Sequence, residues 1–489
     1  MRLRIKPRPE YLAQRLFRVD KRFRTAVRPS KRVAAVAEAF GLGLDEEQVF
    51  TVFQDFTLDI EPGRIVLVLG ESGGGKSLLL RSIAGEMERL EEFRPVIDAS
   101  RIRVRRGVPL VETLGRDVSD ALEKLSLAGL NEAYLFLRSF EELSDGQKYR
   151  YRVAKLLDSK AKTWVLDEFT STLDRITARV VAYCLQKAAR RRGVTVLAAT
   201  THDDICEDLN PDVVVRKRFG PAVSVDYRSP SPRPCSILGE TVVERGDMRD
   251  YEALKQFHYK SGEVFGVRAV YRARVGEELA GVIVYSVPIL LLSARFRAFP
   301  FLREKFRESG GMGEWAKLVN SLFTRIARVV VHPKYRSVGL GVKLVRETLP
   351  LAGTPYVETL AVMARYNPFF EKAGMVRVDA PPPRDQFFER LAALGIGPEA
   401  SYSWRRVAES LRGASRRVLL EVRRLCVERL ERLRAARFRS RTALLAKLRR
   451  GLDLEAMARV IAMRPLHTVY LAWRRSDRPD LPEPRASEA

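Results

Sequence analysis

The chain has 489 residues, 46% of them apolar, and a formal net charge of +26. This length exceeds one ordinary folding unit and predicts roughly two to four domains. Its cysteines, Cys184, Cys206, Cys235 and Cys426, lie far apart, which excludes a disulfide framework or a Cys-x-x-Cys zinc site and predicts a cytoplasmic protein. The longest apolar stretch is too short and too interrupted to cross a bilayer, so we expect no transmembrane domain in the chain.

The positive charge is concentrated towards the two ends of the chain. Residues 1–32 hold twelve basic and two acidic residues, and residues 403–475 hold twenty basic and six acidic residues, so the two segments carry +24 of the +26. Like charges at this density repel one another unless an anionic partner compensates them. We therefore expect these ends to bind nucleic acid, RNA rather than DNA, through its phosphates. An acidic membrane surface and a helix with solvated arginines are the alternatives.

The alternation of β-branched runs with helical stretches predicts two α/β domains. A Pro/Ser-rich segment, RSPSPRPCS at 228–236, supports neither a helix nor a central strand and separates them. We therefore divide the chain into a basic N-terminal extension (1–44), a first α/β domain (45–228), a linker (229–237), a second α/β domain (238–397) and an arginine-rich helical tail (398–489).

The first domain contains a predicted phosphate-binding loop. After the apolar strand Ile65–Leu69, the segment GESGGGKS runs from Gly70 to Ser77, and a helix follows. Such a loop directs backbone N–H groups at phosphates, while Lys76 reaches the β and γ oxygens and the Ser77 hydroxyl holds Mg²⁺. The predicted nucleotide contacts are Gly70, Ser72, Gly73, Gly74, Gly75, Lys76, Ser77 and Leu78.

Further motifs follow in a fixed order. A buried strand ends in Asp167, suited to metal-bound water, and Glu168, suited to a general base. Before it, LSDGQ at 143–147 is similar to the LSGGQ signature of ABC ATPases, with Asp145 at the first glycine. Ser171–Asp174 is similar to the D-loop of that family, and His202 follows the strand Val194–Thr200 where the family has its switch histidine. The first domain therefore resembles an ABC-type P-loop ATPase.

The resemblance implies an ATP-dependent homodimer, because in that family the signature of one subunit covers the nucleotide held by the other. Ser144, Gly146 and Gln147 would then act in trans, with Asp174 also at the nucleotide. Glu168 and His202 would be the catalytic residues. ATP and Mg²⁺ are the implied cofactors.

Two family positions are harder to assign. In the ABC family a glutamine, the Q-loop residue, lies between the phosphate-binding loop and the signature. No glutamine occurs between Ser77 and Leu143, so Glu112 is our candidate to replace it, with a contact to the metal ion. The interval is also short for a transporter ATPase, which argues against coupling to a membrane domain. The aromatic residue that stacks on adenine would be Phe53 or Phe50.

A second phosphate-binding turn is predicted in the second domain. A β-branched strand, Arg325–His332, leads into YRSVGLG at 335–341 and a helix from Val342. Glycines at a helix N-terminus expose backbone donors to a pyrophosphate. Downstream, NPFFEKAGM at 367–375 follows the predicted strand Tyr356–Ala364. The domain resembles a GNAT-like acyltransferase, which implies acetyl-CoA contacts from Val331, Arg336, Val338, Gly339, Gly341 and Asn367.

Acyl transfer to an amine needs a base and an acid for the CoA thiolate. Tyr366 is the nearest phenol to the predicted site, and Glu358 and His258 are the candidate bases; each is also compatible with a purely structural role. We therefore expect an ATPase coupled to an acyltransferase that acts on RNA or a ribonucleoprotein. The alternatives are a mechanical ATPase on DNA or ribosomes, with the GNAT-like fold as a binding module, and the motor of an importer.

Overall fold

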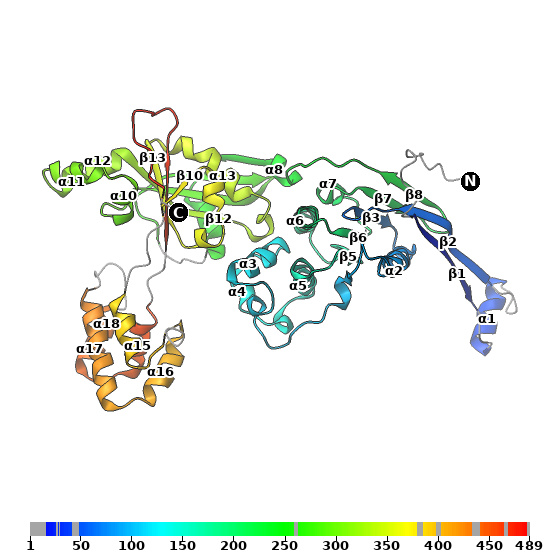
Figure 1. Cartoon of the computed structure of the whole chain (residues 1–489), viewed down its shortest axis with the longest axis horizontal. Helices are drawn as coiled ribbons and strands as arrows, with labels where there is room; N and C mark the ends of the chain where they lie inside the picture. The colour runs from blue at the N-terminus through cyan, green and yellow to red at the C-terminus, as the bar shows by residue number, and fades with distance from the viewer. Residues whose placement is uncertain are drawn as a thin grey trace. The chain divides into compact units, whose positions relative to one another are not determined.

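The computed structural model describes residues 16–25, 28, 30–41, 48–258, 263–378, 385–397, 402–432, 441–463 and 468–486, without the side chains of residues 24, 25 and 48–50. The chain divides into two compact units. One unit comprises residues 1–359, 366–376 and 471–484, and the other comprises residues 360–365, 377–470 and 485–489. Figure 1 labels the elements. Among the helices of the described ranges, none is long and apolar enough to cross a membrane.

The first domain is built on a six-stranded sheet in the order β4-β5-β6-β3-β7-β8. Its strands are β3 (Ile65–Gly70), β4 (Val96–Asp98), β5 (Thr163–Leu166), β6 (Thr195–Thr200), β7 (Val213–Lys217) and β8 (Val223–Tyr227). The pairs from β4 to β7 are parallel, and β8 runs antiparallel to β7. Every residue of β5 and β6 is buried, because a parallel sheet is covered on both faces.

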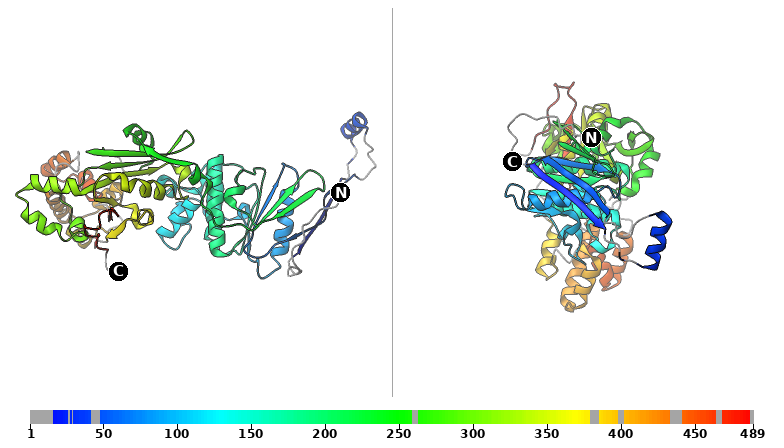
Figure 2. Two further views of the ribbon diagram at one scale, coloured as in Figure 1. Left: turned by 90° about the horizontal axis from the view of Figure 1, so that it is seen from above. Right: turned by 90° about the vertical axis from the view of Figure 1, so that its right-hand side faces the viewer.

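Helices cover both faces of this sheet (Figures 1 and 2). They are α2 (Lys76–Met87), α3 (Val118–Leu127), α4 (Ala133–Phe136), α5 (Asp145–Asp158), α6 (Arg175–Arg192) and α7 (Cys206–Leu209). One core contains buried residues of α3, α5 and α6, and the other contains those of α2. The carboxyl ends of β3, β5 and β6 meet at one edge, where ligands bind in folds of this kind.

The N-terminal extension differs from its prediction as a separate basic arm. Strand β1 (Leu16–Thr25) pairs antiparallel with β2 (Gln48–Asp59), and α1 (Lys31–Phe40) lies between them in the chain. Phe17 and Val19 are buried in the core beside α2, whereas Arg18 is exposed. This alternation has the period of a strand, so the predicted boundary at residue 45 separates two strands that pair.

The second domain contains a seven-stranded sheet in the order β14-β15-β13-β12-β11-β10-β9. The strands are β9 (Thr241–Arg245), β10 (Val267–Val275), β11 (Glu278–Ser286), β12 (Phe323–Val331), β13 (Tyr356–Ala361), β14 (Val376–Val378) and β15 (Val469–Arg474). Its helices are α8 (Ser236–Glu240), α9 (Met248–Leu254), α10 (Ser293–Ala298), α11 (Leu302–Glu308), α12 (Met312–Leu322), α13 (Leu340–Thr348) and α14 (Phe369–Lys372).

Strands β12 and β13 are parallel and part soon after they begin. Their register covers three pairs, from Phe323 with Tyr356 to Arg325 with Glu358. Strand β12 continues to Val331, still paired with β11 on its other side. The region between β12 and β13 beyond these three pairs, where the two strands are no longer paired, is named the wedge.

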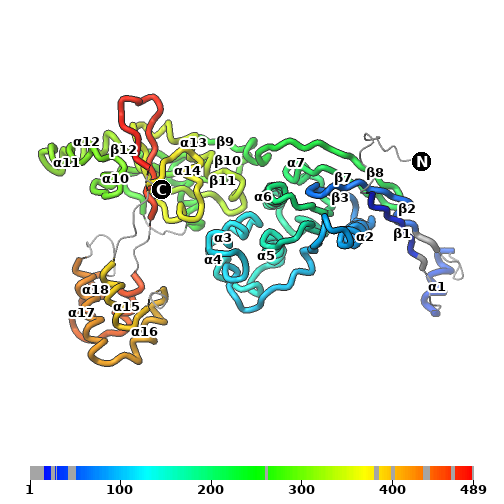
Figure 3. Tube along the Cα trace, in the orientation of Figure 1, coloured from blue at the N-terminus to red at the C-terminus, as the bar shows by residue number. Residues whose placement is uncertain are grey.

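The C-terminal part of the chain differs from the predicted helical tail, because it includes a strand of the second sheet. Strand β15 lies in the second sheet between β13 and β14, so the preceding helices are an insertion between two strands. Figure 3 traces this excursion and return of the chain. The N–H of Arg475 donates to Pro355 O (2.9 Å), and the Tyr356 hydroxyl donates to Pro482 O (2.7 Å). These bonds explain why the segment returns to the sheet.

The inserted helices form a unit with its own core. They are α15 (Gln386–Ala393), α16 (Trp404–Arg412), α17 (Arg416–Arg432), α18 (Arg441–Arg450) and α19 (Leu454–Ile461). Leu411, Val422, Leu430, Leu448 and Met457 are among its buried residues. Helix α15 belongs to this unit, so the unit begins before the predicted boundary at residue 398.

Candidate functional site

The predicted phosphate-binding loop connects β3 to α2 and depends on its glycines. Gly73 and Gly75 have φ values of +77° and +92°, which side-chain-bearing residues rarely adopt. A Cβ on Gly70 would lie 2.1 Å from Lys217 O, and one on Gly75 would lie 2.5 Å from a methyl of Val52. The backbone can therefore curl tightly around the start of α2, as a phosphate cradle requires.

Lys76 and Ser77 begin α2 and face the loop and β5. Lys76 Nζ donates to Gly70 O (2.8 Å) and Glu71 O (2.7 Å). Burial lowers the pKa of Lys76, although Asp167 and Glu168 oppose this effect. The Ser77 hydroxyl donates to Asp167 Oδ1 (3.0 Å). The glycine cradle, the lysine and this hydroxyl–carboxylate pair fit a triphosphate with a magnesium ion.

The two carboxylates after β5 have different surroundings. Asp167 is half-buried and also accepts the N–H of Glu168 (3.1 Å). Glu168 has a φ of +50° and an exposed side chain. Because such a backbone persists only where its surroundings hold it, the turn presents Glu168 as an exposed carboxylate next to the anchored Asp167.

Tyr149, which the sequence reasoning missed, braces this turn. Its hydroxyl accepts the N–H of Thr170 (3.3 Å), whose φ is +63°. Burial raises the pKa of Tyr149, which keeps the phenol neutral. The available signal was helical spacing, because Tyr149 precedes the buried Val153 and Leu156 at intervals of four and seven residues.

The signature segment forms the N-terminus of α5. Ser144 caps the helix, and Gln147 closes a reciprocal capping box with it. The side chain of Asp145 is 96% exposed, and an acidic residue is favourable in a first helical turn. A Cβ on Gly146 would lie 3.3 Å from Thr172 O, so this end of the helix approaches the Ser171–Asp174 turn closely.

Asp174 and His202 lie after this turn and after β6. Asp174 caps α6 by accepting the N–H of Thr177 (3.0 Å). Burial opposes ionisation of Asp174, but hydrogen bonds from Thr177 and the charge of Lys334 keep its pKa below the ordinary value. The N–H of His202 donates to Thr200 Oγ1 (3.2 Å), and its half-buried ring follows the carboxyl end of β6.

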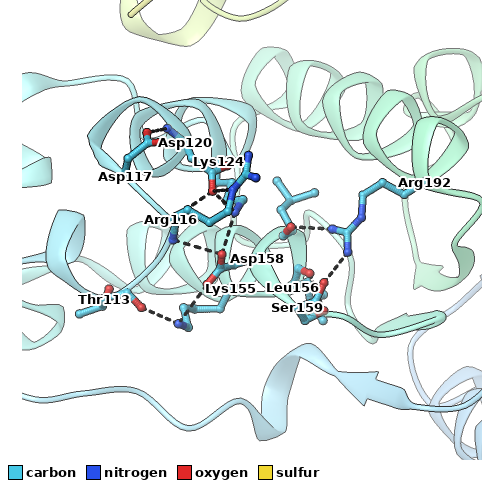
Figure 4. Close-up of polar contacts among 12 residues, drawn as sticks. Thr113, Arg116, Asp117, Asp120, Lys124, Lys155, Leu156, Asp158, Ser159 and Arg192 are labelled. Atoms are coloured by element: carbon cyan, nitrogen blue, oxygen red, sulfur yellow. Dashed lines mark hydrogen bonds and ion pairs between the residues drawn. The ribbon is translucent and has the colours of Figure 1, made fainter.

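Glu112 ends a short 3-10 helix, η2 (Leu110–Glu112), and is exposed. The next residues are fixed to α5 (Figure 4). Lys155 Nζ donates to Thr113 O (2.7 Å), and Asp158 accepts the N–H of Gly115 (3.1 Å) and pairs with Lys124 (2.8 Å). This network holds the segment, but within the described residues no hydrogen bond connects Glu112 to Ser77 or Asp167, and its metal role stays a prediction.

The adenine-stacking prediction needs correction for Phe53. Its side chain is fully buried, packs near Phe56 and lies 5.1 Å from Lys217 Nζ. A ring enclosed beneath the loop has no free face for a base. The side chain of the other candidate, Phe50, lies outside the described residues.

The YRSVGLG turn of the second domain is anchored to the first domain. Arg336 donates to Val331 O (2.8 Å), to Phe257 O (3.1 Å) and to Asn131 O of the first domain. Burial lowers the pKa of Arg336 to about 10. Ser337, with a φ of +72°, donates to Ser126 O (2.9 Å).

Two further contacts complete this junction. Asn131, itself buried, donates to Pro333 O (3.3 Å). The Cys184 thiol donates weakly to Ser337 O (3.8 Å). The Arg336 side chain, predicted to contact a cofactor, therefore joins the two domains.

The glycines of this turn adjoin the start of α13. Gly339 caps the helix with a φ of +105°, and Val338 is buried. A Cβ on Gly341 would lie 3.6 Å from the Phe369 ring, so Phe369 covers this glycine at van der Waals distance. The first N–H groups of α13 have no partner within the helix and are the donors available to an anion. Asn367, beyond β13, is exposed, and Tyr366 is half-buried.

The structure argues against Glu358 as a base. Arg295 of α10 bonds both of its carboxylate oxygens, with Nε at 2.9 Å from Oε2. Both side chains are almost completely buried. The guanidinium of Arg295 thus occupies both oxygens of this buried carboxylate, which leaves neither of them free for a substrate proton. His258 is half-buried.

Comparison with known proteins finds one family model that matches part of the first domain, together with similar ATP-binding proteins. The ABC transporter family model matches residues 53–171. The ATP-binding protein YjkB of Bacillus subtilis is 34% identical over an alignment of 180 residues, and the match covers 31% of this chain and 70% of YjkB. The methionine import ATP-binding protein MetN 3 of Pectobacterium atrosepticum is 27% identical over 34% of this chain and 57% of its own length.

A solved ATP-binding cassette, described as a dimer bound to ADP and phosphate, is 19% identical with a TM-score of 0.31 and covers 37% of this chain and 93% of its own. The family match takes in the phosphate-binding loop, the signature and both carboxylates. With the geometry of that loop and the likeness to YjkB, it leads to one conclusion: the chain belongs to the ABC transporter family of ATP-binding proteins.

Proposed function

We propose that the chain is an ATP-driven N-acyltransferase acting on RNA or a ribonucleoprotein, and that two copies pair around two ATP molecules. ATP hydrolysis by the first domain follows from its family. The acyltransferase half, the acceptor and the pairing are proposals. The observation that carries the acyltransferase half is the parting of β12 and β13 beside the N-terminus of α13.

In the ATPase half, the chain supplies each group that hydrolysis needs. Ser77 and Asp167 would hold Mg²⁺, whose charge offsets that of the phosphate oxygens. Lys76 would bind the β and γ phosphates. Glu168 would accept the proton of the attacking water. His202 would orient the γ phosphate, as the family resemblance implies.

The pairing of two copies is supported by the signature segment. Ser144 and Asp145 are exposed at the start of α5, so this helix end is accessible to a second copy. Ser144, Gly146 and Gln147 of one copy would then cover the nucleotide of the other. The solved cassette described as a dimer is in line with this arrangement.

In the acyltransferase half, the wedge between β12 and β13 would receive the thioester arm of acetyl-CoA. Parallel strands that part leave a crevice at their carboxyl ends, which is where ligands bind in α/β sheets. The pyrophosphate would meet the free N–H groups at the start of α13, around Gly339 and Gly341, where the helix dipole favours anions. The strand order around this wedge fits the GNAT-like fold that the motifs resemble.

The transfer chemistry assigns roles to few side chains. An amine nitrogen of the acceptor attacks the thioester carbonyl carbon, the C–S bond breaks, and the CoA thiolate takes up a proton. Tyr366 is the proposed donor of that proton. His258 is the proposed base, because Glu358 is held by Arg295. Asn367 is an exposed candidate contact for the cofactor arm.

The junction between the domains supports a coupling of the two halves. Arg336 and Ser337 belong to the turn that leads into α13, and they bond to Asn131 and Ser126 of the ATPase domain. Asp174, whose turn would border the second copy, lies close enough to Lys334 for their charges to interact. Closure of two copies around ATP would thus be transmitted to the turn that holds acetyl-CoA.

The buried Arg295–Glu358 pair favours a second function, because it removes one proposed base. In this alternative the chain is a mechanical ATPase on DNA or ribosomes, and the second domain binds without transferring. An importer motor, suggested by the name of MetN 3, would need a separate membrane partner.

Calorimetric titration with acetyl-CoA tests the proposal. Gly341→Asp adds a negative charge to the first turn of α13, next to the N–H groups that would bind the pyrophosphate, and an acidic first turn is compatible with the helix. We expect wild type to bind and the variant to bind at least about tenfold more weakly, equivalent to about 1.4 kcal/mol. Gly310→Asp is the control, because a Cβ there meets open space. Absence of binding by wild type would reject the acyltransferase in favour of the mechanical ATPase.

A further inference from the structure

A row of arginines crosses the ATPase domain outside the motifs already described. Arg101, Arg103, Arg105 and Arg106 lie between β4 and η2, and all four are exposed. The intervening Ile102 and Val104 pack against the core of the domain. The alternation fixes the segment by its apolar side chains and leaves the guanidinium groups in solvent. Helix α5 adds Arg152 and Lys155, which are one helical turn apart. These six residues are named the basic strip.

The acidic groups near the basic strip do not neutralise it. Asp98 lies 3.7 Å from Arg101, and Glu141 lies 4.0 Å from Arg106. Asp158 is shared between Lys124 and Lys155 (Figure 4). Within the described ranges, no carboxylate lies within 4.0 Å of a nitrogen of Arg103 or Arg105.

Two other features mark the strip as a surface that lacks its partner. Arg152 Nε is buried and has no hydrogen-bond partner among the described residues. Three residues of the strip also line a cavity of ≈ 380 Å³, whose lining residues are Ile97, Arg101, Ile102, Arg103, Lys155, Asp158 and Ser159. Arginine forks bind phosphate oxygens in pairs, and a concave site with several cations concentrates anions.

We propose that the basic strip binds the phosphodiester backbone of single-stranded nucleic acid on the ATPase domain itself. Arg101, Arg103 and Arg105 are exposed at alternate positions of one segment, which matches a chain of repeating charges. A membrane surface is a weaker match, because interfacial segments insert apolar side chains and here Ile102 and Val104 face the core. The inference deepens the proposed function, on whose nucleic-acid acceptor it rests.

The position of the strip connects it to the ATP site. Lys155 donates to Thr113 O, one residue after Glu112, and the signature forms the other end of α5. A phosphate that draws Lys155 away from Thr113 loosens the segment that carries Glu112. Bound nucleic acid therefore changes the rate of ATP hydrolysis through this surface.

Fluorescence anisotropy of the full chain with a labelled oligouridine tests the inference. Arg103→Ala/Arg105→Ala is compared with Arg81→Ala/Arg89→Ala, two exposed arginines on and after α2. Each phosphate contact to a single strand contributes about 0.7 to the slope of log K against log salt. We expect the slope of the strip variant to be smaller by about 1.4. Raising the salt from about 50 to 200 mM should then weaken RNA binding by the variant about sevenfold less than it weakens binding by wild type. The variant should also lose the stimulation of its ATPase by RNA. The control should match wild type.

The outcomes separate the inference from the function on which it rests. If wild type binds RNA and the strip variant retains its affinity and salt slope, the inference is wrong while the proposed acceptor stands. If wild type binds no nucleic acid, both fail. A single-stranded DNA of the same length shows whether the strip prefers RNA or DNA, and a preference for either nucleic acid supports the inference. The inference would be overturned in favour of a lipid surface if wild type bound phosphatidylserine vesicles and the strip variant lost this binding while it still bound RNA.

Discussion

Replacing Arg336 by methionine removes the guanidinium that joins the domains and keeps most of the apolar stem. Three carbonyl oxygens then lose a charged donor, those of Val331, Phe257 and Asn131. An unsatisfied buried acceptor costs about 1–3 kcal/mol. The lower bound gives about 3 kcal/mol for the three, which is large for a single substitution but within the observed range.

This cost converts into a measurable shift of the melting temperature. A loss of 1 kcal/mol lowers the Tm of a domain of 150–250 residues by about 2–4 °C, so Arg336→Met should melt about 6–12 °C below wild type in calorimetry. Hydrogen exchange should also accelerate around Ser126 and Asn131, because the loss is local to the junction.

Arg346→Met is the matched control, because Arg346 is exposed on the neighbouring helix α13 and, among the residues that the structure describes, its side chain makes one hydrogen bond, to Lys372 O. Its expected effect is less than about 1 kcal/mol. If the two variants melt together and exchange alike around Asn131, the junction is not held by Arg336 and the reasoning is refuted.

Three further predictions concern the ATPase domain. Glu168→Gln should lower the rate of ATP hydrolysis by about 10²- to 10⁴-fold without weakening ATP binding, measured by phosphate release and nucleotide titration; an unchanged rate would exclude Glu168 as the base. Tyr149→Phe removes the brace on Thr170, worth about 0.5–1.5 kcal/mol, and should lower kcat by about 2- to 10-fold at constant KM. Tyr134→Phe, at an exposed tyrosine of α4, should leave kcat unchanged, and equal effects would contradict a positioning role. Asp158→Asn should lower the Tm at neutral pH and flatten the decline of the Tm in acid. Burial raises the pKa of Asp158, but the hydrogen bonds from Lys124 and Gly115 outweigh burial and hold this pKa below its ordinary 3.8. The stability that the ionised Asp158 contributes is therefore present above pH 3.8 and is lost as the pH falls through the lowered pKa, and parallel acid profiles of variant and wild type would refute this prediction.

The ATP site could be read from the sequence because its chemistry requires fixed residues at fixed spacings. Gly75 must adopt a positive φ, and the Ser77 hydroxyl must reach Asp167, as the structure has them. Tyr149 was missed because its helical spacing indicates only a buried position, whereas its contact with Thr170 depends on the folded structure. Phe53 was misassigned because an aromatic near the loop can equally pack beneath it.

The parts that sequence reasoning missed depend on contacts between residues far apart in the chain. Strand β15 lies beside β13 although the inserted helices separate the two strands along the chain, and no local sequence period indicates such an insertion. Arg336 was assigned to a cofactor from its motif, whereas its partner Asn131 lies 205 residues earlier. Glu358 likewise gains its buried partner Arg295 through tertiary packing.

The central claim is that ATP and acetyl-CoA act on one chain through a shared junction, and binding linkage measures it directly. Acetyl-CoA should be titrated into Glu168→Gln with and without saturating ATP. We predict that ATP changes the Kd of acetyl-CoA by about 5- to 150-fold, the range of typical coupling energies, and that Arg336→Met abolishes this change. An acetyl-CoA affinity that is identical with and without ATP would contradict the account.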